Sequence, residues 1–196
     1  MGVKMNVPVD ISNVIIETKR LIIRPWKKED LNDFYEYASV NGVGQMAGWN
    51  PHKSKQESQE ILNMFIEHKI TFALELKRNK KVVGSIGLER IEIDLGEPYT
   101  SLRGREVGYV LSKEYWGQGL MPEAVIKVME YCYKELNCEF LQCRHAFENE
   151  QSKRVIEKAG FQYVQECERT GRDGIKRKSM VYINKQSDKT ATGRRQ

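Results

Sequence analysis

The sequence predicts one α/β domain in which a single mixed sheet carries helices on its faces. Its hydrophobic pattern switches between helical spacing and strand-like alternation, in the order strand, two helices, three strands, helix, strand, helix and two strands. The chain has 196 residues, of which 40% are hydrophobic, and this is enough for one domain with a substantial core.

The first part of the chain predicts a strand and two helices. Residues 14–26 contain β-branched and apolar runs that Pro25 closes, which is typical of a strand. Residues 27–39 place apolar side chains at helical spacing, and 41–51 hold the glycines and polar residues of a loop. Ser54 can cap the second helix, whose apolar stripe consists of Ile61, Leu62, Phe65 and Ile66.

The middle of the chain predicts a hairpin, a further strand and a long helix. Residues 70–77 and 81–93 have extended character on either side of a polar turn, which indicates an antiparallel hairpin. A loop at 94–104 leads to a strand at 105–112. Residues 119–136 are expected to be helical, because one face gathers Leu120, Ala124, Val125, Val128, Cys132 and Leu136.

The last part predicts a strand, a short helix and a closing pair of strands. Residues 139–147 read as a strand and 148–161 as a helix, in which Gly160 can take the left-handed conformation of a C-terminal cap. The final antiparallel pair turns around residues 170–174. The domain is expected to span 14–184, and the basic segment 185–196 is expected to be a disordered tail.

Composition argues against several classes of protein. The net charge of +5 is concentrated in the tail, so the body lacks the basic face that nucleic-acid binding favours. No apolar run approaches the ~20 residues of a membrane span, and the start lacks a signal peptide's apolar core. The four cysteines form no C-x-x-C pair and the three histidines lie far apart. We therefore expect a cytoplasmic protein without a metal, a nucleic-acid partner or a membrane partner.

The stretch EYWGQGLMPEAV, residues 114–125, predicts an anion site. It lacks the Walker pattern, and Pro122 stands where a G-x-G-x-x-G motif requires glycine. A tight turn nevertheless separates a strand from a helix whose first N–H groups have no internal partner and attract phosphate. Gly117 and Gly119 would let a ligand approach this backbone closely. The alternative is an ordinary strand-to-helix turn.

Four ordered segments of this chain resemble the GCN5-related N-acetyltransferase (GNAT) family, in its RimJ/RimL-like branch. Residues 116–121, WGQGLM, are similar to the family signature Q/R-x-x-G-x-G/A, from which Trp116 and Met121 depart. TKRLIIRP (18–25) resembles the opening strand of the branch, and EVGYVL (106–111) resembles its fourth strand. ENEQSKRVIEKAGF (148–161) resembles its N-x-x-S segment, and the resemblance covers residues 14–184.

This resemblance implies an N-acetyltransferase domain that uses acetyl-CoA in a sheet whose fourth and fifth strands splay apart. The pantetheine arm would pair with the backbone of the fourth strand, and the pyrophosphate would rest on the glycine turn. Asn149 and Ser152 would reach the pantetheine, although Asn149 can also be a simple helix cap. The implied donor residues are Tyr109, Val110, Leu111, Gly117, Gln118, Gly119, Leu120, Met121, Asn149 and Ser152.

The same family resemblance also points to candidate catalytic residues. Many relatives carry a tyrosine acid four residues before the G-F glycine, where this chain has Ile156. Ser152 is our candidate to hydrogen-bond the departing thiolate. Glu106 is the first choice of base, and an ion pair with an arginine is its alternative role. Glu168 is the second candidate base, and His145 is expected to be structural.

The acceptor expected from the resemblance is a primary amine. A protein N-terminus of the ribosomal type is one possibility, and a small amine such as an antibiotic or polyamine is the alternative. Glu92, Asp94 and Glu97 could bind a polycation, but Arg103 and Arg105 follow closely. Trp49 either lines the acceptor site or folds over the core. Loss of the tyrosine also leaves open a non-catalytic acyl-CoA-binding module, and a monomer or a homodimer is compatible with the sequence.

Overall fold

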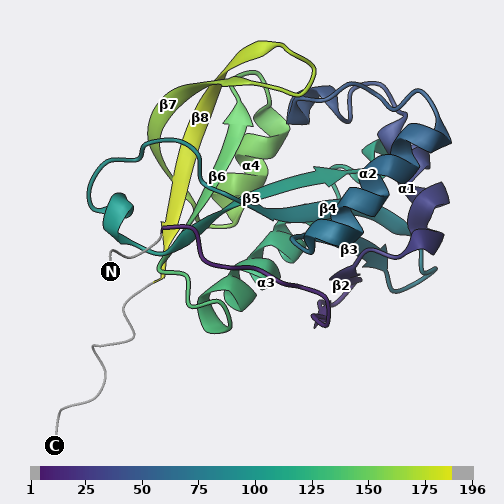
Figure 1. Cartoon of the computed structure of the whole chain (residues 1–196), viewed down its shortest axis with the longest axis horizontal. Coiled ribbons are helices and arrows are strands. Elements are labelled where there is room, and N and C mark those ends of the chain that lie inside the picture. The colour runs from purple at the N-terminus through teal and green to yellow at the C-terminus, as the bar shows by residue number, and fades with distance from the viewer. Residues whose placement is uncertain (1–4, 187–196) are drawn as a thin grey trace, which may run out of the picture.

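Eight strands form one sheet in the computed structural model, which describes residues 5–186 (Figure 1). The strands are β1 (Ile16–Glu17), β2 (Leu21–Pro25), β3 (Thr71–Leu76), β4 (Val82–Glu89), β5 (Gly104–Leu111), β6 (Phe140–Ala146), β7 (Gln162–Thr170) and β8 (Lys176–Lys185). The helices are α1 (Leu31–Ala38), α2 (Lys55–His68), α3 (Leu120–Lys134) and α4 (Glu150–Lys158). The strand order is β1-β2-β3-β4-β5-β6-β8-β7.

The sheet is mostly antiparallel, and its two halves meet at one parallel pair, β5 with β6. This pair extends only from Gly104 to Glu106 on β5, against Phe140 to Gln142 on β6. Beyond it, β5 stays with β4 while β6 stays with β8, and Figure 1 shows the two strands turning apart. The predicted α/β class and the splay between these strands, the fourth and fifth of the family's count, are confirmed.

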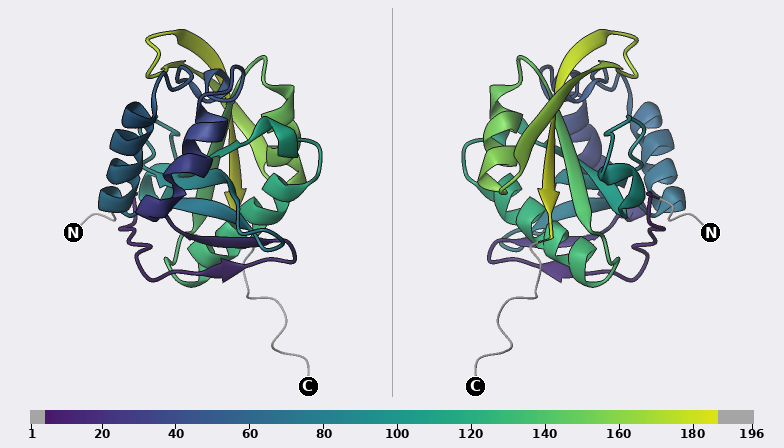
Figure 2. Two further views of the ribbon diagram at one scale, coloured as in Figure 1. Left: turned by 90° about the vertical axis from the view of Figure 1, so that its right-hand side faces the viewer. Right: turned by 90° about the vertical axis from the view of Figure 1, so that its left-hand side faces the viewer.

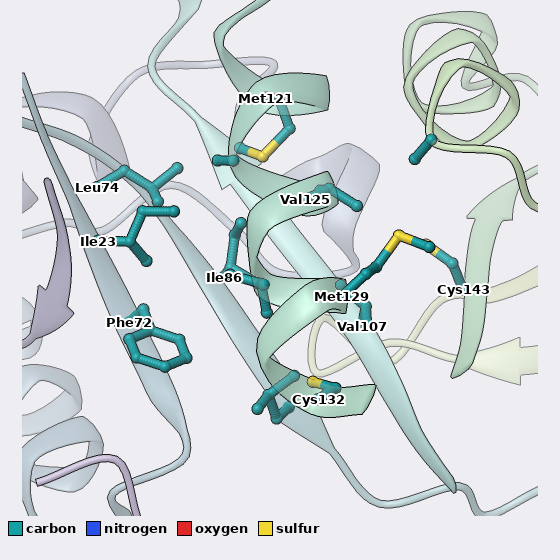
Figure 3. Packing of buried hydrophobic residues seen from close by; sticks show 14 of the residues in the cluster. Ile23, Phe72, Leu74, Ile86, Val107, Met121, Val125, Met129, Cys132 and Cys143 are labelled. Carbon is teal, nitrogen blue, oxygen red and sulfur yellow. The ribbon is translucent and has the colours of Figure 1, made fainter. Parts of the chain in front are cut away.

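Helices cover both faces of the sheet (Figure 2). On one face α3 packs its apolar side on the strands, and Met121, Val125, Met129 and Cys132 lie toward the sheet in Figure 3. On the other face α1 and α2 enclose an aromatic cluster. Its members include Trp26, Phe34, Tyr37 and Phe65. Each large apolar side chain removed from water in these layers contributes about 1.5–3 kcal/mol, so both helical layers stabilise the sheet.

Local sequence signals explain most element boundaries. Ser54 caps α2 as predicted, because its Oγ accepts a hydrogen bond from the Glu57 N–H at 3.2 Å. Gly160 follows α4 with φ +82°, the left-handed conformation expected there. The predicted strand 14–26 is instead a hairpin of β1 and β2. The Thr18 hydroxyl accepts from the Leu21 N–H at 2.8 Å and closes the turn that splits it.

The chain before residue 14 also packs on the domain. Val7 and Ile11 are buried in the core, and the Gly104 N–H donates to the Met5 carbonyl at 2.6 Å. At the other end β8 includes Lys185, while residues 187–196 of the predicted tail lie outside the described residues. Within the described part, no helix has both the length and the apolar composition to cross a bilayer.

A buried ionic network ties β2 and β3 to the start of α1. Both Arg24 Nη atoms donate to the Asp30 carboxylate at 2.8 Å, and Arg24 Nε donates to Glu75 at 2.7 Å. All three residues are at most 8% exposed. The arginine therefore depends on these carboxylates for the hydration that it has lost.

Replacing Asp30 by alanine is expected to lower the free energy of unfolding by about 3–5 kcal/mol, because a buried cation loses its bidentate partner. Urea unfolding measures the change. Asp10→Ala is the control, since Asp10 is exposed and lies 3.6 Å from Lys69, and its effect should stay within about 0.5 kcal/mol. Equal effects of the two substitutions would contradict a stabilising role of the network.

Candidate active site

A cavity of about 1000 Å³ opens where β5 and β6 separate. It is lined by the end of β5, the turn before α3 and the start of α4, and it continues to residues of α1, α2 and β4. Past Glu106, β5 has no ladder partner on its β6 side, so backbone N–H and C=O groups are left for a ligand. The exception is the Leu111 carbonyl, which accepts from Trp116 Nε1 at 2.8 Å. The sheet itself therefore produces a cleft that can pair with an extended molecule.

The turn before α3 presents its backbone to this cavity. Gly117 and Gly119 have φ +75° and +72°, and a side chain at Gly117 would meet nothing within 4 Å. Gly119 is the N-cap of α3, so the free N–H groups of the first helical turn follow it directly. Leu120 and Met121 are buried beneath the turn. This open space beside unpaired N–H groups fits a phosphate.

Arg20 fixes the shape of the turn from outside. Its Nη1 donates to the Gln118 carbonyl at 2.8 Å, and its Nη2 forms an ion pair with Glu123 at 2.7 Å. The Gln118 side chain donates to the Glu114 carbonyl and does not line the cavity, unlike Gly117 and Gly119. The Gln118 side chain thus points away from the predicted donor site, and its backbone N–H stays a predicted contact.

A hydroxyl pair joins β5 to α4 across the cleft. The Tyr109 and Ser152 hydroxyls hydrogen-bond at 2.8 Å, and the Tyr109 hydroxyl also donates to the Ser152 carbonyl at 3.0 Å. Burial raises the pKa of Tyr109 well above its ordinary value, so the phenol stays protonated. Asn149 caps α4, since its Oδ1 accepts from the Ser152 N–H at 3.0 Å. The structure therefore brings these three predicted residues together, along with Val110 and Leu111 on the cavity wall.

Glu106 occupies the last paired position before the strands separate. Its carboxylate accepts from Arg144 Nε at 2.9 Å and from Gln142 Nε2 at 2.7 Å, and it also forms an ion pair with Arg144 Nη2 at 2.7 Å. Burial raises the pKa of this carboxyl, and the Arg144 guanidinium opposes that shift. The ion pair considered as its alternative role is present, with Arg144 as the partner. A role of Glu106 as base stays a prediction.

The other acid and base candidates lie differently. Ile156 has an aliphatic side chain that is fully buried, so it cannot supply a proton. Glu168 is exposed on β7, where it pairs with Lys176, and it does not line the cavity. His145 lines the cavity but is held by the Ala146 carbonyl at 2.8 Å and by the Tyr182 hydroxyl at 3.3 Å. Of the three carboxylates considered for a polycation, only Glu92 reaches the cavity.

Part of the cavity wall carries no recognisable sequence motif. Arg154 and Lys158 are exposed, line the cavity and lie four residues apart on α4, next to the proposed donor residues. On the opposite side, Trp49 and His52 from the loop before α2 join Tyr37 of α1 and Ser85 of β4. Trp49 both lines the cavity and packs on the aromatic cluster, and its contact with an acceptor stays a prediction. Contacts across separate elements assemble this end, and no short motif encodes them.

Glu106→Gln should lower the free energy of unfolding by about 3–5 kcal/mol, since it leaves Arg144 buried without a counter-charge. Denaturant unfolding measures the loss, and a second change, Arg144→Met, should restore most of it. Glu168→Gln removes an exposed carboxylate and should cost at most about 1 kcal/mol. Equal, small losses for both glutamates would show that the Arg144 pair does not anchor the splay.

Comparison with known proteins agrees with this architecture. The family model described as "Acetyltransferase (GNAT) domain" matches residues 20–162. The protein named "Uncharacterized N-acetyltransferase p20" of Bacillus licheniformis is 25% identical over 150 residues, which cover 74% of this chain and 80% of that protein.

Two solved structures share the fold. The ribosomal-protein-S5-alanine acetyltransferase of Vibrio fischeri has a TM-score of 0.70 at 22% identity, covering 90% of this chain and 98% of its own. Mycobacterium smegmatis RimJ in complex with CoA-disulfide has a TM-score of 0.73 at 15% identity, covering 94% and 93%. Since the family model spans well over half of the residues, the chain belongs to the GNAT acetyltransferase family and is an acyltransferase.

Proposed function

We propose that this enzyme transfers the acetyl group of acetyl-CoA to a primary amine, with the N-terminus of a ribosomal-type protein as its acceptor. The main support for this proposal is one continuous cavity that joins the glycine turn, the free edge of β5 and the aromatic residues beside α1 and α2. A structure of similar fold holds CoA-disulfide, and another is named for ribosomal protein S5. The free thiols of the four described cysteines are compatible with a cytoplasmic location.

The donor would bind mainly through backbone groups. The pyrophosphate fits the N–H groups from Gly117 to Met121, and the pantetheine fits the free edge of β5 at Tyr109 to Leu111. Arg154 and Lys158 of α4 add positive charge to the wall of the cavity. The amine then attacks the thioester carbonyl, an N–C bond forms and the C–S bond breaks. The single Tyr109 proton can go to the Ser152 carbonyl or to Ser152 Oγ. When it goes to Oγ, the Ser152 O–H is free to hydrogen-bond the departing sulfur.

The charges around the cavity favour a peptide over a polycation. Seven basic and four acidic side chains line it. Without Arg154 and Lys158, which lie on the donor side, the basic residues still outnumber the acidic ones. One of these basic residues, Arg177, is paired with Asp173, so the remaining charges balance. A polyamine or an aminoglycoside would find no surplus of carboxylates there, whereas a peptide N-terminus brings a single positive charge.

The acceptor is tested by offering the purified protein acetyl-CoA with a panel of amines and measuring released thiol. The panel contains peptides that begin with alanine or serine, the same peptides with blocked N-termini and internal lysine, polyamines, aminoglycosides and free amino acids. Thiol release is expected with unblocked peptides. Release with polyamines or aminoglycosides alone would establish the small-amine alternative. Tight CoA binding without release from any acceptor would establish the non-catalytic alternative.

Gly117→Ala should weaken CoA binding about tenfold, because the new methyl group enters the space assigned to the pyrophosphate. Calorimetric titration with CoA measures the change. Gly96→Ala is the matched control, since Gly96 also has a left-handed φ (+64°) and open surroundings but does not line the cavity. Both substitutions carry similar backbone strain, so equal CoA affinities of the two variants would show that the turn does not bind CoA.

Ser152→Ala should lower kcat about 10- to 100-fold, the effect of losing one hydrogen bond to a charged group, while CoA affinity changes little. Tyr109→Phe should act in the same direction. Thiol-release kinetics and CoA titration separate the two effects, and Ser101→Ala, an exposed position at the end of the 3-10 turn Tyr99–Ser101, serves as the control. An unchanged kcat in Ser152→Ala would show that this hydroxyl does not stabilise the departing thiolate.

A further inference from the structure

The acceptor side of the cavity ends in a pocket of aromatic residues, named here the aromatic end. It consists of Phe34, Tyr37, Trp49, His52 and Phe65, all of which line the cavity. It lies on the α1/α2 face, opposite the face that α3 and α4 cover. Val110 of β5 packs against the same cluster, so the aromatic end adjoins the strand proposed to hold the pantetheine.

His52 is held rigidly in this pocket. Its side chain is buried, and its Nδ1 lies 2.7 Å from the Ser58 hydroxyl. Its ring meets the Phe34 ring edge-to-face, with centroids 5.2 Å apart, and lies 5.1 Å from the Trp49 ring. Its backbone N–H donates to the Ala38 carbonyl at 3.0 Å. Nδ1 is therefore committed, and Nε2 has no hydrogen-bond partner among residues 5–186.

A second polar group in the aromatic end lacks a partner. Tyr37 is 2% exposed, and its buried hydroxyl makes no hydrogen bond of regular geometry within the described chain. Burial raises the pKa of this hydroxyl, although the Ser85 side chain lies near enough to oppose that shift. Its ring lies 5.5 Å from that of Phe34, which also contacts His52. Native proteins rarely leave such a hydroxyl unsatisfied. The phenol and the imidazole thus indicate that a polar ligand group or a bridging water occupies this end.

We propose that His52 is the general base, and that its Nε2 takes a proton from the acceptor amine directly or through one water. This inference rests on the proposed acetyl transfer. As the nitrogen attacks, the N–C bond forms, the C–S bond breaks and the N–H proton passes to Nε2. The thiolate leaves, and the imidazolium then returns its proton to solvent. The Tyr37 hydroxyl hydrogen-bonds the amine or the relaying water.

The surroundings of His52 favour the neutral imidazole that a general base requires. Burial lowers the pKa of His52 from its ordinary value, although the Glu57 carboxylate opposes the shift. The polar groups in contact with His52 are the Ser58 hydroxyl of α2 and the Ala38 carbonyl of α1. The Tyr37 phenol and Ser85 of β4 line the same cavity. His52 is therefore neutral at pH 7. A free Nε2 lone pair requires Nδ1–H to donate to Ser58, which makes Ser58 a positioning residue.

The test compares His52→Asn with His68→Asn. Asparagine can keep the contact to Ser58 but has no Nε2, whereas His68 is exposed at the end of α2. His52→Asn should lower kcat at pH 7 by about 10²- to 10⁴-fold with unchanged CoA affinity, and His68→Asn should match the wild type. Because the pKa of His52 is lowered, the wild-type kcat/KM should fall only at a pH below the ordinary histidine value of about 6.5, and His52→Asn should lose this limb.

Chemical rescue distinguishes a base from a structural residue. In His52→Ala the vacated volume can admit imidazole, and added imidazole should restore turnover in proportion to its concentration. Turnover by His52→Asn at the wild-type rate would overturn the role of His52 while leaving the proposed function intact. So would a large loss without rescue in a variant whose unfolding and CoA affinity match the wild type. Failure of the wild type to release thiol with every acceptor would overturn both proposals.

Discussion

The early end of pairing between β5 and β6 is the constraint on which the site depends. Three residue pairs hold the strands together, and the last contains Glu106 and Gln142. The buried glutamate binds Gln142 beside it and Arg144 two residues further along β6. This contact holds the base of the splay, so the strands can diverge beyond it without the sheet falling into two parts. The cavity and the free backbone edge of β5 both follow from that divergence.

The divergence also separates two kinds of recognition. On the α3/α4 side, the glycine turn and the edge of β5 offer backbone N–H and C=O groups, which depend little on side-chain identity. On the α1/α2 side, the wall consists of side chains such as Trp49, His52 and Tyr37. A donor shared by a whole family suits the first kind. An acceptor that differs between relatives suits the second, because single substitutions there change shape and charge without disturbing the sheet.

This separation explains how much the sequence could predict. The elements were recognised from local periodicity and caps such as Ser54, and the glycine turn from adjacent residues. The β1–β2 hairpin was missed because its turn depends on one hydroxyl, that of Thr18, within an apolar run. The partner of Glu106 was not identified because Arg144 lies 38 residues away. His52 was missed because its neighbours come from α1, α2 and a loop, which only the folded chain brings together.

The position of Ile156 on α4 serves core packing and not the chemistry of the cleft. It is fully buried in the main core cluster, where a larger, polar tyrosine would be overpacked and its hydroxyl would need a partner. The phenol near the cleft instead comes from β5, where Tyr109 reaches across to Ser152. The position of this hydroxyl is set by β5, which is fixed by its pairing with β4. The missing helix tyrosine is therefore compatible with catalysis, since Tyr109 of β5 and Ser152 of α4 bring a phenol and a serine hydroxyl together at the cleft.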